Sequence, residues 1–257
     1  KAVQVSLDGV AEIQDRQRPT AVDGKSSPIV FRTIDLLLAK GVEVIIHSVV
    51  TDLGVARIPE IVRFLAERFP GTKTIHLEPA CRCGRGLTTN QRFPSPDLFV
   101  QGFIEAERIA KPLGIEVFYS GAGPWLSEYH RRFCGVVAPN FVVTPEGLVT
   151  ACHEAAELNH PLAPYFIYGH LDRAGGKFVL DSEKIKKLRS YARVVDEDTL
   201  CQGCFARFYC AGDCLAKSLN SGGERSASLN PRCVVNRELT RHYIFNELLR
   251  QEKGGMS

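Results

Sequence analysis

The segment CQGCFARFYCAGDC, residues 201–214, places four cysteines at the spacing C-x2-C-x5-C-x3-C. Two thiolates that are separated by two residues can converge on one metal centre within a single tight turn. The glycines at 203 and 212 permit backbone shapes that direct the sulfurs inward. The segment therefore predicts a metal centre, and the fold of the surrounding chain is expected to be built around it.

Further cysteines extend this pattern on both sides. Upstream, Cys134 and Cys152 are spaced C-x12-G-x4-C with Gly147 between them, and Cys233 follows downstream. The chain has nine cysteines, an odd number that cannot pair completely as disulfides within one chain. The first residues, KAVQVSLDG, do not resemble a secretory signal. Clustered thiols in such a chain indicate metal binding more than disulfides.

Two kinds of metal site are compatible with these cysteines. Structural zinc takes four ligands in a closed tetrahedron, and iron–sulfur clusters are also usually held by four cysteine thiolates. The seven cysteines named above are one short of two full sites of either kind. An incomplete site suits a cluster that binds another ligand, a substrate or solvent, and it suits structural zinc poorly. Spacing alone leaves both alternatives open.

The residues before about position 120 alternate between strand and helix patterns. Strands are predicted at 2–7, 42–50, 74–79 and 115–120, and helices at 28–40, 58–69 and 95–114. This alternation predicts an α/β fold with parallel strands joined by right-handed crossovers. The number of strands fits part of a barrel or an open sheet. In a barrel the loops after the strands line the reaction face, and these loops are predicted at 8–19, 51–58 and 80–90.

The character of the sequence changes near residue 121. From there the chain is rich in loops and carries seven of the nine cysteines. We predict a hairpin over 141–152 that turns at Pro145-Glu146-Gly147, and helices over 182–193 and 237–253. We predict one domain over 1–125 and a second over 126–236, followed by a C-terminal helix and tail over 237–257.

Composition limits the classes of partner. The chain has 257 residues, of which 44% are hydrophobic, enough for one or two domain cores. A formal net charge of +3 does not indicate nucleic-acid binding. No run approaches the roughly 20 apolar residues of a membrane-spanning helix. We therefore expect a cytoplasmic protein with neither nucleic acid nor membrane as partner.

Taken together, the seven cysteines resemble the SPASM domain of radical S-adenosylmethionine (AdoMet) enzymes. The segment VSLDGVAEIQDRQRP (5–19) resembles the fourth strand region of the radical AdoMet barrel. HLEPACRCGRG (76–86) resembles its sixth strand and the following loop. The resemblance covers essentially the whole chain. It implies the C-terminal part of a partial (β/α)6 barrel, followed by a small, loop-rich α+β SPASM domain that binds iron–sulfur clusters.

The family's C-x3-C-x2-C motif does not occur in this sequence. In the family this motif holds the cluster that cleaves AdoMet, and a glycine-rich segment after the second strand contacts the cofactor. We therefore expect that the N-terminal half of the barrel is a missing segment or a separate chain. The full-length protein is expected to bind AdoMet and a third 4Fe–4S cluster, and this chain alone is expected to be inactive.

The resemblance also assigns ligands to two auxiliary 4Fe–4S clusters. The second cluster would take Cys201, Cys204, Cys210 and Cys233. The first would take Cys134, Cys152 and Cys214. Many family members carry one more cysteine just upstream of the position of Cys134, but SEYHRRF (127–133) contains none. This leaves an open iron site or a substitute ligand such as His130.

Cofactor contacts follow from the resemblance as well. Ser6, Asp8, Arg16 and Arg18 stand where the family contacts the ribose and carboxylate of AdoMet, and a guanidinium matches a carboxylate well. Arg85 is a further candidate contact to cofactor or substrate. The alternative is that Asp8 begins an ordinary turn and the arginines belong to a solvated loop.

Three residues are candidates for a catalytic role. Cys81 and Cys83 lie in a loop that would face the reaction chamber, as a cluster ligand, a hydrogen-atom donor, a disulfide-forming pair or two incidental thiols. His153 follows Cys152, where sulfatase-maturing relatives carry an aspartate that is proposed as a base. Histidine also accepts protons near neutral pH, although His153 is equally well a solvated neighbour. The departure from aspartate disfavours a sulfatase-maturing role.

These observations predict a radical AdoMet/SPASM maturase that acts on a peptide or small protein. The resemblance implies a thioether, a carbon–carbon crosslink or a related radical modification. The alternative is a non-catalytic, metal-stabilised module that binds a peptide and contains iron–sulfur clusters or zinc.

Overall fold

The computed structural model describes residues 2–81, 94–138, 140–191, 194–197, 199–220 and 231–254. The described residues up to 123 form one compact unit, and those from 124 onward form a second. Among these residues, no helix combines the length and the apolar character that a membrane crossing requires.

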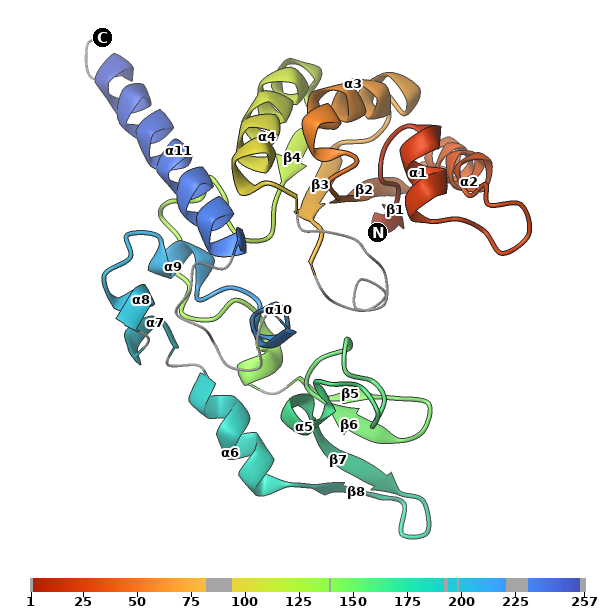
Figure 1. Ribbon diagram of the computed structural model, residues 1–257, viewed down its shortest axis with the longest axis vertical. Helices are drawn as coiled ribbons and strands as arrows, with labels where there is room; N and C mark the ends of the chain where they lie inside the picture. The colour runs from red at the N-terminus through yellow and green to blue at the C-terminus, as the bar shows by residue number, and fades with distance from the viewer. Residues whose placement is uncertain are drawn as a thin grey trace. The chain divides into compact units, whose positions relative to one another are not determined.

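The first unit is built on a parallel sheet of four strands (Figure 1). The strands occur in the order β1-β2-β3-β4, and every neighbouring pair is parallel. Their bounds are β1 (Ala2–Ser6), β2 (Glu43–Val50), β3 (Thr74–Pro79) and β4 (Glu116–Phe118). The α/β class and all four predicted strands are confirmed.

Three long helices connect these strands, and they too are confirmed. They are α2 (Ser27–Ala39), α3 (Ile58–Arg68) and α4 (Pro96–Ala110). Each has a proline in its first turn, where the fixed φ and the missing N–H of proline cost nothing. Helix α2 ends just before Gly41, whose φ of +68° is readily adopted by glycine at a helix C-terminus.

The loop predicted over 8–19 is wrong in part, because residues Ala11–Gln17 form helix α1. Only one apolar residue of this segment, Ile13, enters the core, so the segment has no apolar periodicity to reveal a helix. The other buried side chains of α1 are Gln14 and Gln17. A short 3-10 helix, η1 (Val55–Arg57), likewise lies within the loop predicted over 51–58.

The two faces of the sheet differ in burial. Along β2, Val44, Ile46, Ser48 and Val50 are buried, whereas the alternate residues from Ile45 onward are half-buried. Helices α3 and α4 pack against each other (Figure 1). Fully buried side chains such as Phe99 and Phe103 of α4 each contribute about 1.5–3 kcal/mol of burial free energy. The half-buried face is the one that carries polar side chains.

The second unit contains an antiparallel sheet with the order β5-β6-β7-β8. Strands β5 (Val142–Val143) and β6 (Leu148–Thr150) confirm the predicted hairpin, and Gly147 at its turn has φ +88°. Strands β7 (Ile167–Asp172) and β8 (Lys177–Leu180) were not predicted. All four residues of β8 are exposed, so this strand carries no alternation of buried and exposed residues.

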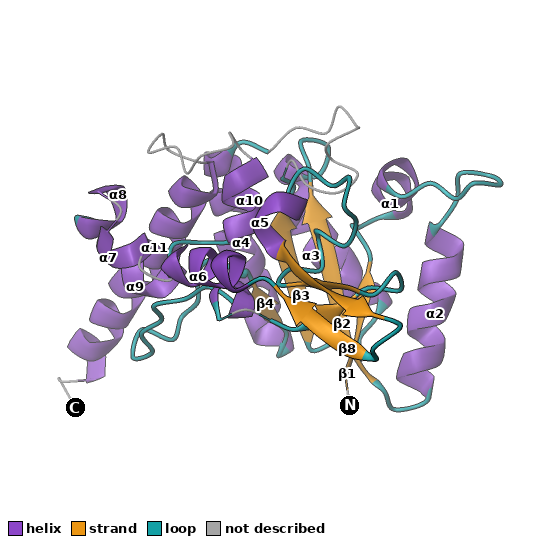
Figure 2. Ribbon diagram, turned by 90° about the horizontal axis from the view of Figure 1, so that it is seen from below, coloured by secondary structure: helices purple, strands orange, loops and turns teal. Residues whose placement is uncertain are grey.

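The helices of this unit are mostly short, apart from the last. They are α5 (Ala163–Phe166), α6 (Ser182–Ser190), α7 (Val194–Glu197), α8 (Thr199–Gln202), α9 (Arg207–Cys210), α10 (Leu215–Asn220) and α11 (Pro231–Gly254). Figure 2 distinguishes the long helix α11 from the short helices α7, α8 and α9. Helix α6 is confirmed. Helix α11 begins six residues before the predicted start at 237, and it therefore contains Cys233.

Candidate functional site

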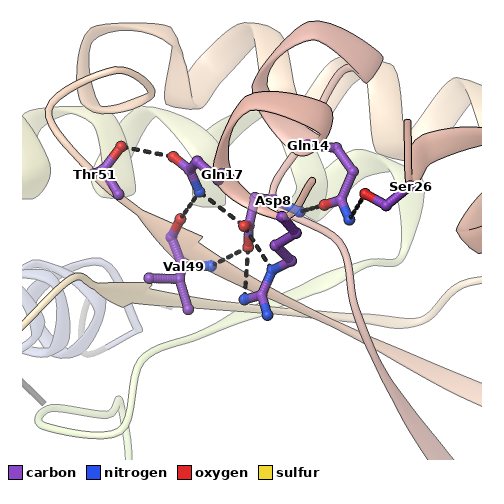
Figure 3. Close-up of polar contacts among 7 residues, drawn as sticks. Asp8, Gln14, Gln17, Ser26, Val49 and Thr51 are labelled. Carbon is purple, nitrogen blue, oxygen red and sulfur yellow. Dashed lines mark hydrogen bonds and ion pairs between the residues drawn. The ribbon is translucent and has the colours of Figure 1, made fainter. Parts of the chain in front are cut away.

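A buried carboxylate organises the carboxyl end of β1. Asp8 is 2% exposed, and Arg18 binds it with two hydrogen bonds, Nε–Oδ2 at 2.7 Å and Nη2–Oδ1 at 3.1 Å. Gln17 Nε2 donates to Oδ2 at 2.8 Å, and the backbone N–H of Val49 donates to Oδ1 at 2.9 Å (Figure 3). The carboxylate accepts four hydrogen bonds, about its full capacity.

Two glutamines hold helix α1 against this carboxylate. Gln14 Oε1 accepts the backbone N–H of Asp8 at 2.8 Å, and its Nε2 donates to Ser26 Oγ at 3.0 Å (Figure 3). Gln17 Oε1 accepts from Thr51 Oγ1 at 2.6 Å. These amides tie α1 to the ends of both β1 and β2, which explains why a segment with little apolar character is helical.

The network leaves one end of Arg18 available. Its side chain is 28% exposed, and its Nη1 has no hydrogen-bond partner among the residues that the structure describes. Asp8 therefore acts as the group that orients Arg18, and Arg18 is the group with remaining capacity for an anionic ligand. Ser6 at the end of β1 and Arg16 in α1 are exposed and make no contact within this network. Arg85 and Cys83 lie outside the described residues, and Cys81 is half-buried.

The structure reveals a row of aligned side chains, of which the sequence analysis named Ser6 but missed His47 and His76. Ser6, His47, His76 and Phe118 pair directly across the four strands. The rings of His47 and Phe118 flank His76, with centroid distances of 4.6 Å and 4.7 Å. A signal existed in the sequence, because histidines stand inside apolar strands in VIIHSVV and TIHLEP. Parallel strands are usually apolar on both faces.

A buried glutamate orients this row. Glu78 Oε1 lies 3.0 Å from His76 Nε2 and also accepts the backbone N–H of Ser120 at 3.0 Å. An ionised carboxylate can only accept, so this contact would take the N–H of Nε2 as its donor. Burial, together with the neighbouring His76, lowers the pKa of His47, which keeps it neutral near pH 7. The half-buried sheet face thus presents the neutral imidazole of His47, which can accept a proton.

The second unit holds the cysteines in two groups of neighbours. In the first group, burial raises the pKa of Cys152, and the carboxylate of Glu154 and the thiol of Cys134 add to this effect. Burial also raises the pKa of Cys214 to about 12, with a smaller contribution from Glu154. Glu154 therefore lies near both Cys152 and Cys214.

The second group surrounds Cys210. Burial raises the pKa of its thiol to about 12, with further contributions from Asp213, Cys201 and Cys233. Cys204 belongs to the same turn as Cys201, because its backbone N–H bonds the carbonyl of Cys201 at 3.0 Å. These four cysteines are the set that the resemblance assigns to the second cluster.

A left-handed turn separates Cys210 from Cys214. Ala211, Gly212 and Asp213 have φ values of +48°, +77° and +60°, and left-handed backbone costs roughly 1–2 kcal/mol for a residue with a side chain. Arg232 holds this turn, with Nε 2.8 Å from Oδ2 and Nη2 2.9 Å from Oδ1 of Asp213. The Arg232 side chain is 1% exposed, so a buried ion pair stabilises the strained turn.

A small pocket with space of about 20 Å³ lies beside Cys134, and Asp213 and Leu215 are among its other lining residues. The residues on either side of Cys214 therefore line the same pocket as Cys134. His130 and His153 are not among the lining residues. His130 is 54% exposed with Nε2 3.7 Å from Glu128, and His153 is exposed.

The chemistry of these groups fits a metal centre held by thiolates. No disulfide joins the cysteines that the structure describes, and backbone N–H groups donate to the sulfurs of Cys152, Cys210 and Cys214. Glu154 Oε2 is buried and has no hydrogen-bond partner among the described residues, a cost that a cation would offset. Within the same residues, no three His, Cys, Asp or Glu side chains are arranged to hold a metal ion. The thiols are therefore grouped but not assembled around a single point.

Comparison with known proteins identifies the fold. The sequence matches no family model and no curated protein. Its structure matches native anSMEcpe, an anaerobic sulfatase-maturating enzyme of the radical AdoMet/SPASM type, with bound AdoMet. The TM-score is 0.65 at 18% sequence identity, over 98% of this chain and 69% of that one.

Two further structures of the same enzyme match similarly. The histidine-tagged form with AdoMet has a TM-score of 0.68 at 18% identity, covering 98% of this chain and 66% of that one. The native form with AdoMet and the Cp18Cys peptide has a TM-score of 0.65 at 18% identity, covering 98% and 70%. The likeness shows that nearly the whole chain shares the fold of these structures, and the chain spans about two thirds of their length.

Proposed function

We propose that this chain is part of a radical AdoMet enzyme of the SPASM type that modifies a peptide or small protein. One combined observation carries the proposal. The shared fold covers 98% of the chain, and seven cysteines stand in the SPASM order. The neighbours include structures with AdoMet and bound peptides, which supports a peptide as the substrate class.

In this proposal the first domain, residues 1–125, is the C-terminal part of the AdoMet-binding barrel. Residues 126–236 form the SPASM domain, and 237–257 form a C-terminal helix and tail. The division of the structure into compact units after residue 123 supports the first boundary. AdoMet and its own 4Fe–4S cluster, when bound in the full-length protein, would supply the radical chemistry that removes hydrogen from the substrate.

The residues of this chain would bind and orient that cofactor. Arg18, held by Asp8, presents its free Nη1 to the AdoMet carboxylate. Ser6 and Arg16 supply further polar contacts at the same end of the sheet, and Arg85 stays a proposed contact. His76, oriented by Glu78, joins His153, Cys81 and Cys83 as a proposed proton-transfer or hydrogen-transfer group.

The N-terminal half of the barrel is the proposed partner of β1. Four of the five residues of this strand are exposed, and β1 lies at the edge of the sheet. Parallel sheets are normally covered on both faces, so an edge this exposed is suited to pairing with a further parallel strand.

In the second domain the two groups of thiols would hold auxiliary 4Fe–4S clusters. Cys201, Cys204, Cys210 and Cys233 are the proposed ligands of one. Cys134, Cys152 and Cys214 are the proposed ligands of the other. Such clusters supply an acceptor for the surplus electron of a radical modification, such as thioether or carbon–carbon bond formation. Zinc has no redox chemistry.

Anaerobic reconstitution of the full-length protein tests the proposal. We expect a brown protein with about eight irons and eight sulfides in the auxiliary clusters and formation of 5′-deoxyadenosine from AdoMet. Colourless protein with stoichiometric zinc would contradict it. Intact clusters without AdoMet cleavage would instead support the alternative of a non-catalytic, metal-stabilised module that binds a peptide.

A further inference from the structure

The first group of thiols is one ligand short. Cys134, Cys152 and Cys214 supply three sulfurs, and an iron–sulfur cluster of four irons usually takes four protein ligands. The sequence suggested His130 as a substitute. In the structure the side chain of His130 is 54% exposed, and its Nε2 lies 3.7 Å from Glu128.

Glu154 is placed to fill this role. It lies two residues after Cys152, and its Oε2 is buried without a hydrogen-bond partner among the described residues. An ionised carboxylate oxygen in this state loses its hydration and gains nothing in exchange. This oxygen would therefore be stabilised by a cation or by a hydrogen-bond donor, and the described residues supply neither.

Packing fixes the position of Glu154. The turn that carries it is closed by the backbone N–H of Ala155, which bonds the carbonyl of Cys152 at 3.0 Å. Ala155 is fully buried in the core of the second unit, and Cys152 and Cys214 both pack against that core. The side chain of Glu154 thus leaves a hydrogen-bonded turn next to the core, near two thiols of the first group.

The surroundings of Glu154 agree with this assignment. Its carboxylate lies near the thiols of both Cys152 and Cys214, and no salt bridge to it occurs among the described residues. An iron centre held by these thiols would therefore lie within reach of the only acidic side chain near both of them that the structure describes with a buried oxygen lacking a partner.

We propose that Glu154 is the fourth ligand of the first auxiliary cluster, with Oε2 bound to the iron that the three cysteines leave open. This inference rests on the proposed function. Ligation displaces a solvent molecule from that iron and moves no electron. A carboxylate oxygen is a harder ligand than a thiolate, so this iron would differ from its three neighbours and would remain exchangeable with a substrate ligand.

The test compares variants of the full-length protein after anaerobic reconstitution. Glu154→Ala should keep its sulfide but lose about one iron of the first cluster on mild oxidation, with the electron paramagnetic resonance signal of a three-iron cluster. Glu157→Ala is the matched control, because Glu157 is exposed and lies in the same segment. It should retain the iron content and spectra of the unmodified protein.

Glu154→Cys provides a second, independent measurement if the alanine variant fails to assemble. It should keep all four irons and resist oxidative loss, because a thiolate then binds the same iron. Iron content and oxidation resistance that are unchanged in Glu154→Ala, or Mössbauer spectra and oxidation resistance that are unchanged in Glu154→Cys, would overturn the inference while leaving the proposed function intact. An unmodified protein that assembles no cluster would overturn both.

Discussion

The two units of this protein bury acidic groups in opposite ways. Asp8 in the first unit accepts four hydrogen bonds, two of them from Arg18. In the second unit Glu154 Oε2 has no partner among the described residues, and burial raises the pKa of Cys210 and Cys214 to about 12. The Asp8 carboxylate thus has its hydrogen-bond partners without a ligand, whereas the Glu154 oxygen lacks a partner among the described residues.

This difference indicates how each unit would meet its ligand. The first unit is a rigid scaffold that offers one cation, Arg18, to an incoming anion. The second unit contains thiols whose pKa is raised by burial, so they become stable as anions only next to a cation. Metal binding should therefore contribute to the folding of the second unit and leave the first nearly unchanged.

Removal of metal should have the largest effect. Structural zinc sites contribute roughly 10 kcal/mol to the folding of small domains, and we expect iron to matter on that scale here. Chelation of the reconstituted protein should abolish hydrogen-exchange protection around Val149 and Leu188 in the second core, while Ile46 and Phe103 in the first stay protected. Equal loss of hydrogen-exchange protection in both units would contradict the inference that metal stabilises the second unit and not the first.

Asp8→Ala should cost about 3–5 kcal/mol, the effect of breaking a buried pair and leaving a charge without its partner. Asp35→Ala is the matched control, because Asp35 pairs with Arg68 at 2.6 Å but is 46% exposed. It should cost much less, because ion pairs on the surface contribute little to stability. Urea unfolding, followed with a probe in the first unit, measures both. A similar decrease in the free energy of unfolding in the two variants would show that the buried Asp8 network stabilises the first unit no more than an exposed ion pair does.

Gly147→Ala should destabilise the second unit by about 1–2 kcal/mol, the cost of left-handed backbone in a residue with a side chain. The φ of Gly147 is +88°, and an added Cβ would lie 3.2 Å from Leu171 Cβ. Gly203→Ala is the control, since an added Cβ there meets nothing within 4 Å. Thermal unfolding of the metal-loaded variants gives the difference, and equal midpoints would contradict the assigned turn.

The smallest expected effect is a pH dependence that arises from His47. Its pKa is lowered by burial and by His76 and Arg18, while Glu78 and Asp8 oppose the shift. Because protonation then favours the unfolded state, the stabilisation is present above about pH 6.5 and is lost as the pH falls. His47→Gln should flatten the dependence of the urea midpoint between about pH 7.5 and about pH 5.5. An unchanged slope would show that His47 is not held neutral.

Much of the fold was predictable because its signals are local. The strands and the long helices of the first unit follow from apolar periodicity, and the hairpin at Gly147 follows from its turn residues. Helix α1 was not predictable in this way, because buried glutamines that bond to Asp8, Ser26 and Thr51 hold it in place. Strand β8 is exposed along its whole length, so no burial pattern marks it.

By itself the sequence determined the order and spacing of the seven cysteines and the alternation of strand and helix. Both patterns depend on residues that are close together in the chain, because the backbone conformation of a turn and the apolar face of a helix or strand are set by residues a few positions apart. Only the tertiary structure decided which side chains meet. Strand register aligns His47 with His76, the left-handed turn at 211–213 separates Cys210 from Cys214, and packing buries Oε2 of the half-buried Glu154 near two thiols. Such contacts join segments far apart in the chain, so no local pattern contains them.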